Sequence, residues 1–431
     1  MFSQRLLTLV LTVCLTWLHP MSWAQDSLNV VLTGEVVCLD NDQALPDAHI
    51  HVKGTSIATQ TNEDGRFSLK LTQLPDTIEI SAIGFRNTLM TRQQIIAAAK
   101  QGKRGRNTLT AEGKQNYDLR IELKSTATLL HDVFVYSPQN ILDAALDRIE
   151  KNYPQTPRTY EAFYRETIRK RSNYVSVSEA VMELYKTSYR HSSNRDMVHI
   201  RKGRSLMSQK ARDTISVHVQ GGPIESLNLD FVKNRELFLN PEVLRFYNLE
   251  IEVPQMINNR PQYVIAFSPR VELNDEPLFS GLMYIDFATL AFTRIEYNMD
   301  MSDQAKATRV MLARKPLGMR FRPRALMVVV NYHDNGQQTL LSYMRVTYRF
   351  DCDWKRRGLA TRYEAVSEML VTDSHPSDER PERRDAFRYT DVLSKKLSDF
   401  ADPDFWRDYN ILLPSESLEH ALRRIKKSFA K

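Results

Sequence analysis

The pattern of hydrophobic and polar positions in the first part of the chain predicts short β-strands. Between Leu28 and Phe85, apolar and polar residues alternate over brief stretches that turn residues separate. In one of these stretches Ile50 and Val52 alternate with two histidines, as expected of a strand that buries one face. Short strands at such regular spacing are typical of a small β-sandwich.

A turn and a helix interrupt this pattern. The run Asn62–Gly65 places an Asp-Gly pair between strand-like residues, which predicts a hairpin with Gly65 at positive φ. Residues 91–115 begin with a helical pattern and then become basic and polar, so we interpret them as an insertion. Tyr117–Leu123 alternates again and is expected to form the last strand of the sandwich.

The second part of the chain combines long strands with amphipathic helices. Apolar residues recur at helical spacing over Gln139–Tyr153 and Ser415–Phe429, so we expect each helix to bury one face. The pattern over 198–249 is mixed and indicates partly helical structure, and Asp334-Asn335-Gly336 predicts a hairpin. Strands are expected at Glu161–Lys170, Tyr174–Lys186, Gln262–Ser268, Phe279–Phe287, Ala291–Met299, Ala325–His333, Thr339–Phe350 and Thr361–Val371.

The N-terminus has the pattern of a secretory signal peptide. A short basic start precedes the apolar run Leu6–Leu18, and small residues favour cleavage after Ala24. The run is too short to span a bilayer, which takes about 20 residues. The residues before Cys14 superficially resemble a lipoprotein cleavage box, so lipidation stays open. No other stretch is long and apolar enough for a membrane helix, so we expect none in the mature chain.

These patterns predict a mostly β protein, with α+β character in its second domain. We expect a signal peptide at residues 1–24, a β-sandwich at 25–124 and a linker at 125–137. A larger antiparallel sheet or open half-barrel with flanking helices should occupy residues 138–431. The chain is long enough to form two hydrophobic cores.

An ordered series of glycines and turns in the first domain resembles a known module. The series is similar to the carboxypeptidase-regulatory-like module, a transthyretin-like or immunoglobulin-like sandwich of envelope proteins in Bacteroidetes. The resemblance covers about the first quarter of the chain and implies a non-catalytic domain. The segments that carry it are Thr33-Gly34-Glu35-Val36, Leu45-Pro46-Asp47-Ala48, Val52-Lys53-Gly54-Thr55, Asp64-Gly65-Arg66-Phe67-Ser68-Leu69 and Ile80-Ser81-Ala82-Ile83-Gly84-Phe85.

Segments of the second domain carry two further resemblances. Gly281–Asp286, followed by Ala291–Glu296, resembles a strand pair of LolA-like carriers, which are open β-barrels wrapped over helices. Glu161–Glu166 and Asp404–Asn410 are similar to exported Bacteroidetes proteins that pair the sandwich module with an uncharacterised C-terminal domain. This second resemblance implies no particular activity.

Charge and cysteine content narrow the choice of partners. A formal net charge of +7 permits contact with anionic lipid or glycan. The basic residues are scattered and form no stripe interleaved with aromatics, so we expect no nucleic-acid partner. Cys38 and Cys352 fall in different predicted domains, and we interpret them as buried thiols. The basic face of the C-terminal helix leaves two alternatives open: docking of its apolar face on the core, or contact with an anionic membrane.

No familiar catalytic motif is visible in the sequence. Gly-x-Ser-x-Gly, His-Glu-x-x-His, Cys-x-x-Cys and phosphate-loop motifs are absent. His49 and His51 have a spacing that can hold a metal, but the nearby sequence offers no third ligand. We therefore interpret both as exposed strand residues. The sequence predicts no catalytic residue, no cofactor, no metal site and no enzyme activity.

Aromatic residues recur along the long strands of the second domain. The plain interpretation is the inner face of an ordinary sheet, packed by the two amphipathic helices. The alternative is an apolar surface that holds an acyl chain or another hydrophobic ligand. The candidate residues for that surface are Phe267, Tyr284, Phe287 and Phe292.

Together these observations predict a non-enzymatic accessory or binding protein of the cell envelope. It would work in the periplasm or on the periplasmic face of the outer membrane, with an envelope protein, a lipid or a glycan as its partner. The sandwich would serve as a docking or spacer unit. One alternative is a LolA-like carrier of lipid or lipoprotein acyl chains, which a deep apolar cavity would favour. The other is a glycan or peptide hydrolase with unfamiliar residues, which two converging carboxylates would favour.

Overall fold

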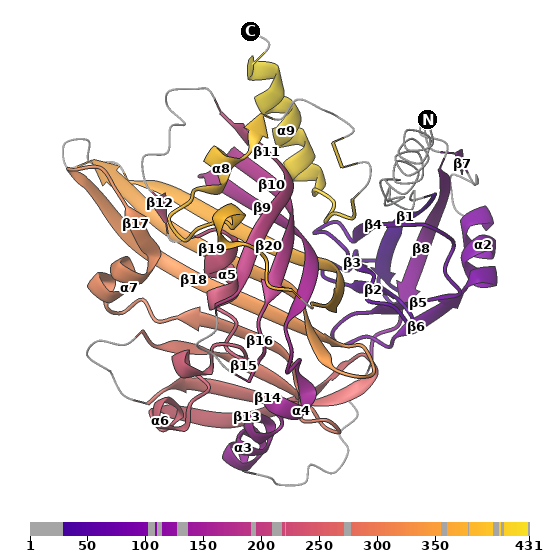
Figure 1. The fold of residues 1–431 in the computed structure, drawn as a ribbon, viewed down its shortest axis with the longest axis horizontal. Helices are drawn as coiled ribbons and strands as arrows, with labels where there is room; N and C mark the ends of the chain where they lie inside the picture. Colours follow the sequence, from indigo (N-terminus) through magenta and orange to yellow (C-terminus); the bar gives the residue numbers. More distant parts are fainter. Residues whose placement is uncertain are drawn as a thin grey trace, which may run out of the picture.

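The chain folds into a small β-sandwich and one large open β-sheet, which lie side by side (Figure 1). The predicted signal peptide at residues 1–24, with Cys14, and most of the predicted linker lie outside the described residues. The computed structural model describes residues 29–101, 108–109, 114–126, 137–190, 195–208, 218–219, 221–270, 277–354, 360–377, 379–399, 405–406 and 409–429.

The N-terminal sandwich consists of two four-stranded sheets around one hydrophobic core. Its strands alternate apolar and polar residues, so each sheet turns one apolar face inward. Helix α2 (Arg92–Gln101) buries Ile95 against this core, which confirms the helix expected in the insertion. One sheet has the order β4 (Arg66–Leu71), β1 (Val30–Cys38), β8 (Gln115–Leu123) and β7 (Thr108–Leu109), and the other has β3 (Ala58–Gln60), β2 (His49–Val52), β5 (Thr77–Ser81) and β6 (Thr88–Thr91).

Two glycines of the sandwich occupy positions that a larger residue would disturb. A Cβ atom on Gly34 would lie 2.0 Å from the carbonyl oxygen of Leu119 on the neighbouring strand. Gly65 has a φ of 71°, which confirms the positive φ predicted for the Asp-Gly turn. The predicted hairpin is wrong, because β3 before the turn and β4 after it belong to different sheets. The turn needs the same backbone conformation in either connection, so the local sequence does not determine which strands pair.

The second part of the chain forms an open sheet whose ten longer strands pair antiparallel. The predicted hairpin at Asp334-Asn335-Gly336 is confirmed between β18 and β19, with Gly336 at a φ of 89°. The short strand β21 extends the edge in parallel with β11. In spatial order the strands are β13 (Tyr247–Ile257), β14 (Arg260–Pro269), β15 (Phe279–Asp286), β16 (Phe292–Met299), β18 (Met319–Asp334), β19 (Thr339–Trp354), β20 (Thr361–Pro376), β9 (Arg158–Lys170), β10 (Asn173–Lys186), β11 (Met197–Met207) and β21 (Ser398–Asp399).

Every long strand expected from the sequence is present, and two further ones lie in the segment 198–249 and just beyond it. This segment holds the short helices that its mixed pattern indicates, but it also contains most of β11 and the start of β13. Strand β13 lies at the edge of the sheet, and none of its residues after Tyr247 is buried. An edge strand with so little buried surface carries a weak hydrophobic pattern, which explains why it was not predicted.

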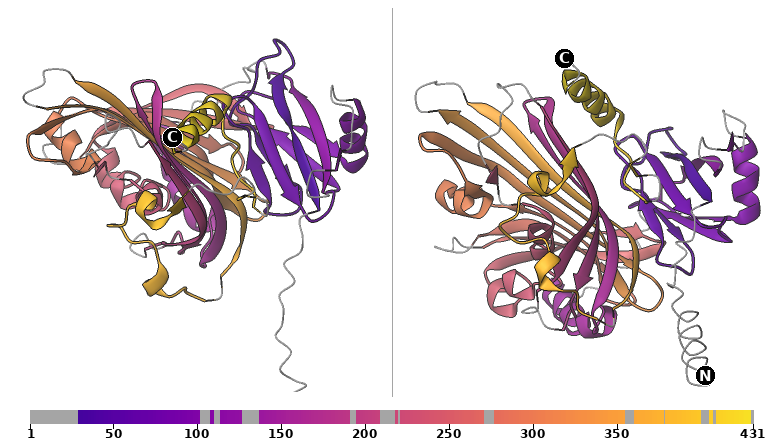
Figure 2. Two further views of the ribbon diagram at one scale, coloured as in Figure 1. Left: turned by 90° about the horizontal axis from the view of Figure 1, so that it is seen from above. Right: turned by 45° about the horizontal axis from the view of Figure 1, so that its top comes forward.

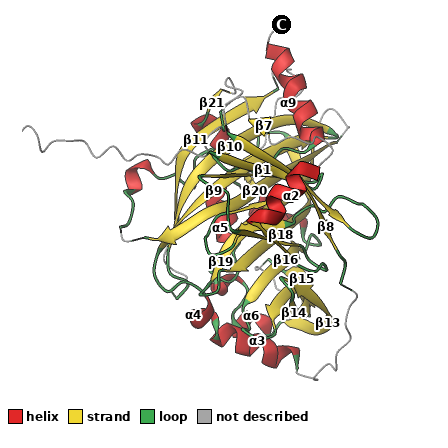
Figure 3. Cartoon of the chain, turned by 90° about the vertical axis from the view of Figure 1, so that its right-hand side faces the viewer, coloured by secondary structure: helices red, strands yellow, loops and turns green. Residues whose placement is uncertain are grey.

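One face of the large sheet, the helix-covered face, packs against short helices and holds the main hydrophobic core. The predicted helix at Gln139–Tyr153 is present as two pieces that join at Arg148, and both bury apolar residues in this core. Figure 3 shows α3, α4 and α6 at the β13 end of the sheet. The small elements of this part are α3 (Pro138–Asp147), α4 (Ile149–Asn152), α5 (Pro223–Asn228), η2 (Arg235–Leu237), α6 (Pro241–Leu244), α7 (Gln304–Met311), η3 (Arg383–Asp385), α8 (Leu393–Lys396) and the strand pair β12 (His218–Val219) and β17 (Leu312–Arg314).

The opposite face of the sheet, the sandwich face, carries the N-terminal sandwich and the C-terminal segment (Figure 2). Helix α9 (Glu416–Phe429) buries Leu418 and Leu422 against β10 and β11, so its apolar face docks on the protein as expected. The expectation that it packs the same face of the sheet as the helix at Gln139–Tyr153 is wrong, because α9 lies on the sandwich face. Before α9, Trp406 and Leu412 pack on Phe163. Among the described helices, none is long and apolar enough to cross a membrane.

Candidate functional site

The four residues predicted as an apolar ligand surface do not share one surface. Phe267 and Phe292 are buried on the helix-covered face of the sheet. Tyr284 alternates with core residues on β15 and therefore points to the sandwich face, where its hydroxyl donates to Glu296 over 3.0 Å. Phe287 lies just beyond β15 and stacks on Tyr263, with ring centroids 3.9 Å apart.

Aromatic side chains of the protein occupy the helix-covered face next to Phe267. Phe238, beside η2, lies 4.5 Å from the ring of Phe267, and Phe231 stacks on Tyr297 at 4.1 Å. All four rings are almost completely buried. The place where an acyl chain would lie on this part of the sheet is therefore filled by the protein itself.

A buried ion-pair network lies in the same core. The carboxylate of Asp230 lies 3.0 Å from Nζ of Lys186 and accepts hydrogen bonds from the hydroxyls of Tyr189 and Tyr332. Burial alone would lower the pKa of Lys186, but the carboxylates of Asp196 and Asp230 raise it above its ordinary value. The charges compensate each other within the core, so we interpret this network as structural.

Two carboxyl groups also approach the helix-covered face. Burial raises the pKa of Glu166, on β9, to about 7, and it also raises the pKa of Glu225, on α5. Both carboxyls lie near the phenol of Tyr348. The carboxylate of Glu225 accepts hydrogen bonds from Tyr389 and Asn228, and no hydrogen bond between the two glutamates is found among the described residues. Two neighbouring carboxyls are what a catalytic acid pair requires, but hydrogen bonds from Tyr389 and Asn228 hold Glu225 rather than a bond to Glu166.

The sandwich docks on the large sheet through polar contacts spread along its length. The amide of Gly84 donates to the carbonyl oxygen of Met256 over 3.0 Å, and the amide of Asn87 donates to Asn259. At the other end, the backbone amide of Lys70 donates over 2.7 Å to Oδ1 of Asn410, in the C-terminal segment that packs on the sheet. The two units therefore form a defined interface, and two hollows remain within it.

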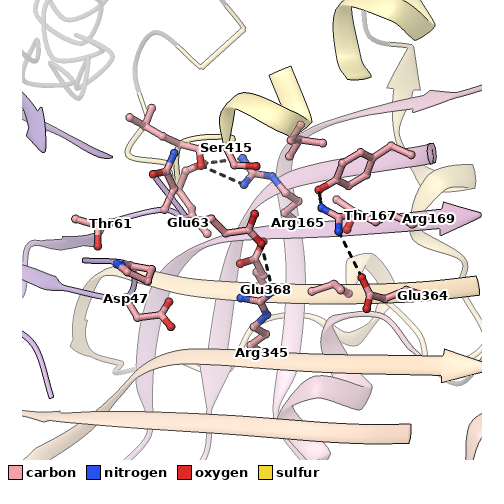
Figure 4. A pocket seen from close by; sticks show the side chains of 17 residues that line it. Asp47, Thr61, Glu63, Arg165, Thr167, Arg169, Arg345, Glu364, Glu368 and Ser415 are labelled. Carbon is pink, nitrogen blue, oxygen red and sulfur yellow. Dashed lines mark hydrogen bonds and ion pairs between the residues drawn. The ribbon is translucent and has the colours of Figure 1, made fainter. Parts of the chain in front are cut away.

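The first hollow is charged and small, about 60 Å³ in volume (Figure 4). Arg165, Arg169 and Arg345 reach into it from the strands of the large sheet. Carboxylates pair with these cations. Arg345 lies 3.6 Å from Glu63 of the sandwich, and Arg165 is paired with the buried Glu179 at 2.8 Å. A space of this size holds a few water molecules, so we do not consider it a site for an organic ligand.

The second hollow, the interdomain cavity, has a volume of about 320 Å³. Its apolar wall comes from both units and includes Ile83 and Phe85 of the sandwich and Ile257 of β13. Its charged residues are already paired. Arg294 binds Glu296 at 2.7 Å, and Asp47 accepts a hydrogen bond from Gln60 over 2.7 Å and faces the guanidinium of Arg345, whose pKa it raises. The cavity thus combines apolar walls with polar groups that carry no uncompensated charge.

Three histidines meet beside this cavity, and we call them the histidine cluster. His49 and His51 come from β2 of the sandwich, and His333 comes from β18 of the large sheet. The ring centroids of His51 and His333 are 4.5 Å apart, and those of His49 and His333 are 4.9 Å apart. His49 and His333 line the cavity, and Nε2 of His333 is buried with no hydrogen-bond partner among the described residues.

The interpretation of the two sandwich histidines as exposed residues is wrong. His51 is only 7% exposed, and His49 is half-buried, because the large sheet covers the outer face of β2. His333 supplies a third imidazole beside His49 and His51, which the sequence near those two residues lacks. Even so, within the described part of the chain no group of His, Cys, Asp and Glu side chains is arranged to hold a metal ion.

The architecture defines the class of protein: a β-sandwich docked on an open antiparallel sheet, with a cavity between them. Within this class, residues 32–135 match the CarboxypepD_reg-like domain, which confirms the resemblance seen in the glycines and turns of the first domain. No curated protein matches the chain in sequence.

Two solved structures are similar to this chain. One is an outer membrane lipoprotein-sorting protein domain from Vibrio parahaemolyticus, with 9% identity over 57% of this chain and 96% of that chain and a TM-score of 0.27. The other is a LolA superfamily protein from Nitrosomonas europaea, with 11% identity over the same shares and a TM-score of 0.21. TM-scores this low do not establish a shared ligand site.

Proposed function

We propose that this protein is a non-enzymatic binding protein of the cell envelope that holds a small ligand in its interdomain cavity. The observation that carries the proposal is the cavity itself, about 320 Å³ between two units that dock on each other. Ligand sites favour domain interfaces and occupy about 300–1,000 Å³, so the location and size both fit. The envelope location rests on the signal-peptide pattern of the N-terminal residues.

The lining of the cavity favours an uncharged ligand. Asp47 faces the guanidinium of Arg345 and Arg294 is paired with Glu296, so a charged ligand would lose its hydration without gaining an unpaired opposite charge. Ser81, Asn331 and Ser342 line the cavity with hydrogen-bonding groups, and Ile83 and Phe85 offer an apolar wall. A neutral ring with hydrogen-bonding groups on one edge, such as an uncharged sugar unit of an envelope glycan, satisfies both requirements.

Carriage of acyl chains is the second candidate, and the packing of the helix-covered face weighs against it. Phe231, Phe238 and Tyr297 fill the space that a chain of methylenes would need. A carrier would have to move these rings out of a well-packed core before it could bind. Each ring that left the core would lose about 1.5–3 kcal/mol of hydrophobic stabilisation.

A cavity-filling variant tests the proposal. Ala82 lines the cavity, so Ala82→Phe should occupy part of it and weaken binding at least tenfold. Calorimetry would compare glucose and N-acetylglucosamine with the charged analogues glucuronate and glucosamine, which should bind at least tenfold more weakly. Leu317→Phe adds a ring on a residue that is 99% exposed and serves as the matched control.

Either of two results would reject this site. Binding that is as tight in the Ala82→Phe chain as in the unmodified chain would place the ligand elsewhere. A clear preference for a charged analogue would contradict the argument from the paired charges of the lining.

A further inference from the structure

The histidine cluster lies at one point of the interface between the two units, and both units contribute to it. Two of its rings belong to β2 of the sandwich and the third to β18 of the large sheet. The rings of His49 and His51 are stacked at 6.2 Å with an interplanar angle of 16°, and His333 lies within 5 Å of both. Any positive charge on His333 therefore faces two further imidazoles across the interface.

The surroundings favour neutral imidazoles while the units are docked. Burial lowers the pKa of His49 well below its ordinary value, and the neighbouring His333 and His51 lower it further. Burial and His51 lower the pKa of His333 to about 4, and burial also lowers the pKa of His51. Desolvation and the proximity of like groups both oppose the uptake of protons here.

The acidic groups around the cluster do not cancel this effect, because burial lowers the pKa values more than the carboxylates raise them. Asp334 faces His333 but pairs with Arg260 at 2.6 Å. Glu79 of β5 faces His51 and accepts a hydrogen bond from Asn87 over 2.7 Å, and it favours protonation of His51 less than burial opposes it.

The remaining charged groups of the cavity wall are Asp47, bonded to Gln60, and Arg294, paired with Glu296. The carbonyl oxygen of Thr55 lies 2.6 Å from Nε2 of His51 and is the one backbone group that favours its protonation. The carboxylates of Asp334 and Glu79 therefore offset only part of the cost of a positive charge on the cluster.

We propose that the histidine cluster makes the docking of the sandwich acid-sensitive, so that mild acid separates the two units and opens the interdomain cavity. When the units separate, the three imidazoles return to water and titrate near their ordinary pKa of about 6.5. The separated form therefore binds more protons than the docked form between pH 6.5 and the lowered values in the docked form. By linkage, docking is fully favoured above about pH 6.5 and weakens as the pH falls toward 4.

Protonation acts on the interface rather than on either unit alone. His49 and His51 sit on one strand and repel each other equally in the docked and separated forms, apart from the change in burial. His333 is brought to them only by docking, so its repulsion is relieved only by separation. The regulation of ligand release rests on the proposed function, whereas the separation itself does not.

Small-angle X-ray scattering of the full mature chain without ligand, from pH 7.5 to pH 4.5, tests the proposal. We expect a reversible rise in the radius of gyration while the far-UV circular dichroism stays unchanged. His333→Gln removes the titrating group and should shift the midpoint of this rise to lower pH by at least about one unit. His420→Gln removes an exposed histidine of α9 and should leave the midpoint unchanged.

His49→Gln provides a second test if the His333→Gln chain does not fold. A radius of gyration that stays constant down to pH 4.5 would overturn the proposal. An acid-transition midpoint in the His333→Gln chain that equals the midpoint of the unmodified chain would also overturn the proposal. This holds whether the transition is separation of the two units or unfolding of the whole chain. If separation occurs as expected but no ligand binds at pH 7.5, the proposed function fails and the acid-sensitive docking stands.

Discussion

Replacement of Gly65 by alanine adds one methyl group, and its cost in the stability of the sandwich can be divided into two parts, backbone conformation and steric contact. Gly65 has a φ of 71°, a conformation that costs an L-residue about 1–2 kcal/mol. A Cβ atom there would also lie 2.7 Å from the carbonyl oxygen of Val36 and 3.1 Å from Cβ of Ala44. Relief of such a contact shifts the backbone and typically costs a further 1–3 kcal/mol. We therefore expect Gly65→Ala to destabilise the sandwich by about 2–5 kcal/mol.

Gly54 isolates the conformational part of this cost. It has a φ of 82°, and a Cβ atom built there meets no heavy atom within 4 Å. Gly54→Ala should therefore destabilise the sandwich by only about 1–2 kcal/mol. The difference between the two variants reports the contact with the backbone at Val36.

Native-state hydrogen exchange in the full chain measures both effects where they occur. The amide of Val36 donates to the carbonyl oxygen of Gly65 over 2.8 Å, so its exchange reports opening of this part of the sandwich. Urea unfolding alone would mix the sandwich with the large sheet, because a chain with two cores need not unfold in one step. Equal losses of protection in the two variants would show that the contact argument is wrong.

Three further predictions concern the large sheet. Glu179 lies between two guanidiniums that hold its pKa below the ordinary value despite burial, so Glu179→Gln should cost about 3–5 kcal/mol at pH 7 by leaving Arg165 uncompensated, and thermal unfolding should show this difference narrowing as acid protonates Glu179. Phe231→Ala removes a fully buried ring and should cost about 3–5 kcal/mol in a urea titration, whereas an effect below 1 kcal/mol would indicate a loosely packed face that could admit a ligand. Because burial raises the pKa of Glu166 to about 7, its carboxyl contributes less to stability as the pH rises from 4.5 to 7; Glu166→Gln should raise the melting temperature at pH 8 but not at pH 5, and an equal change at both pH values would contradict this assignment.

The sequence predicted most of the fold because its strands carry their own pattern. Alternation of apolar residues located the long strands, and the turn at Asp334–Gly336 joined two of them as expected. Strand β13 was not predicted because it lies at an edge of the sheet and buries few side chains. The Asp-Gly turn before β4 shows a second limit, since positive φ at Gly65 is a local property and the choice of sheet is not.

The candidate site could not be predicted, because it depends on how the two units dock. Alternation correctly placed His49 and His51 on the outer face of a strand of the sandwich, but it could not show that the large sheet covers that face. No local pattern links these residues to His333, which lies far along the chain at the end of another strand. The aromatic candidates failed to converge for a related reason: Tyr284 and its neighbours on β15 alternate between two faces that are both covered.

A crystal structure of the protein purified from its native source at pH 7.5 tests the central claim most directly. We expect electron density for a small uncharged ligand within the interdomain cavity, in contact with the side chains of His333 and Phe85. Density for an acyl chain on the helix-covered face, with Phe231 and Phe238 displaced, would contradict it and favour the carrier.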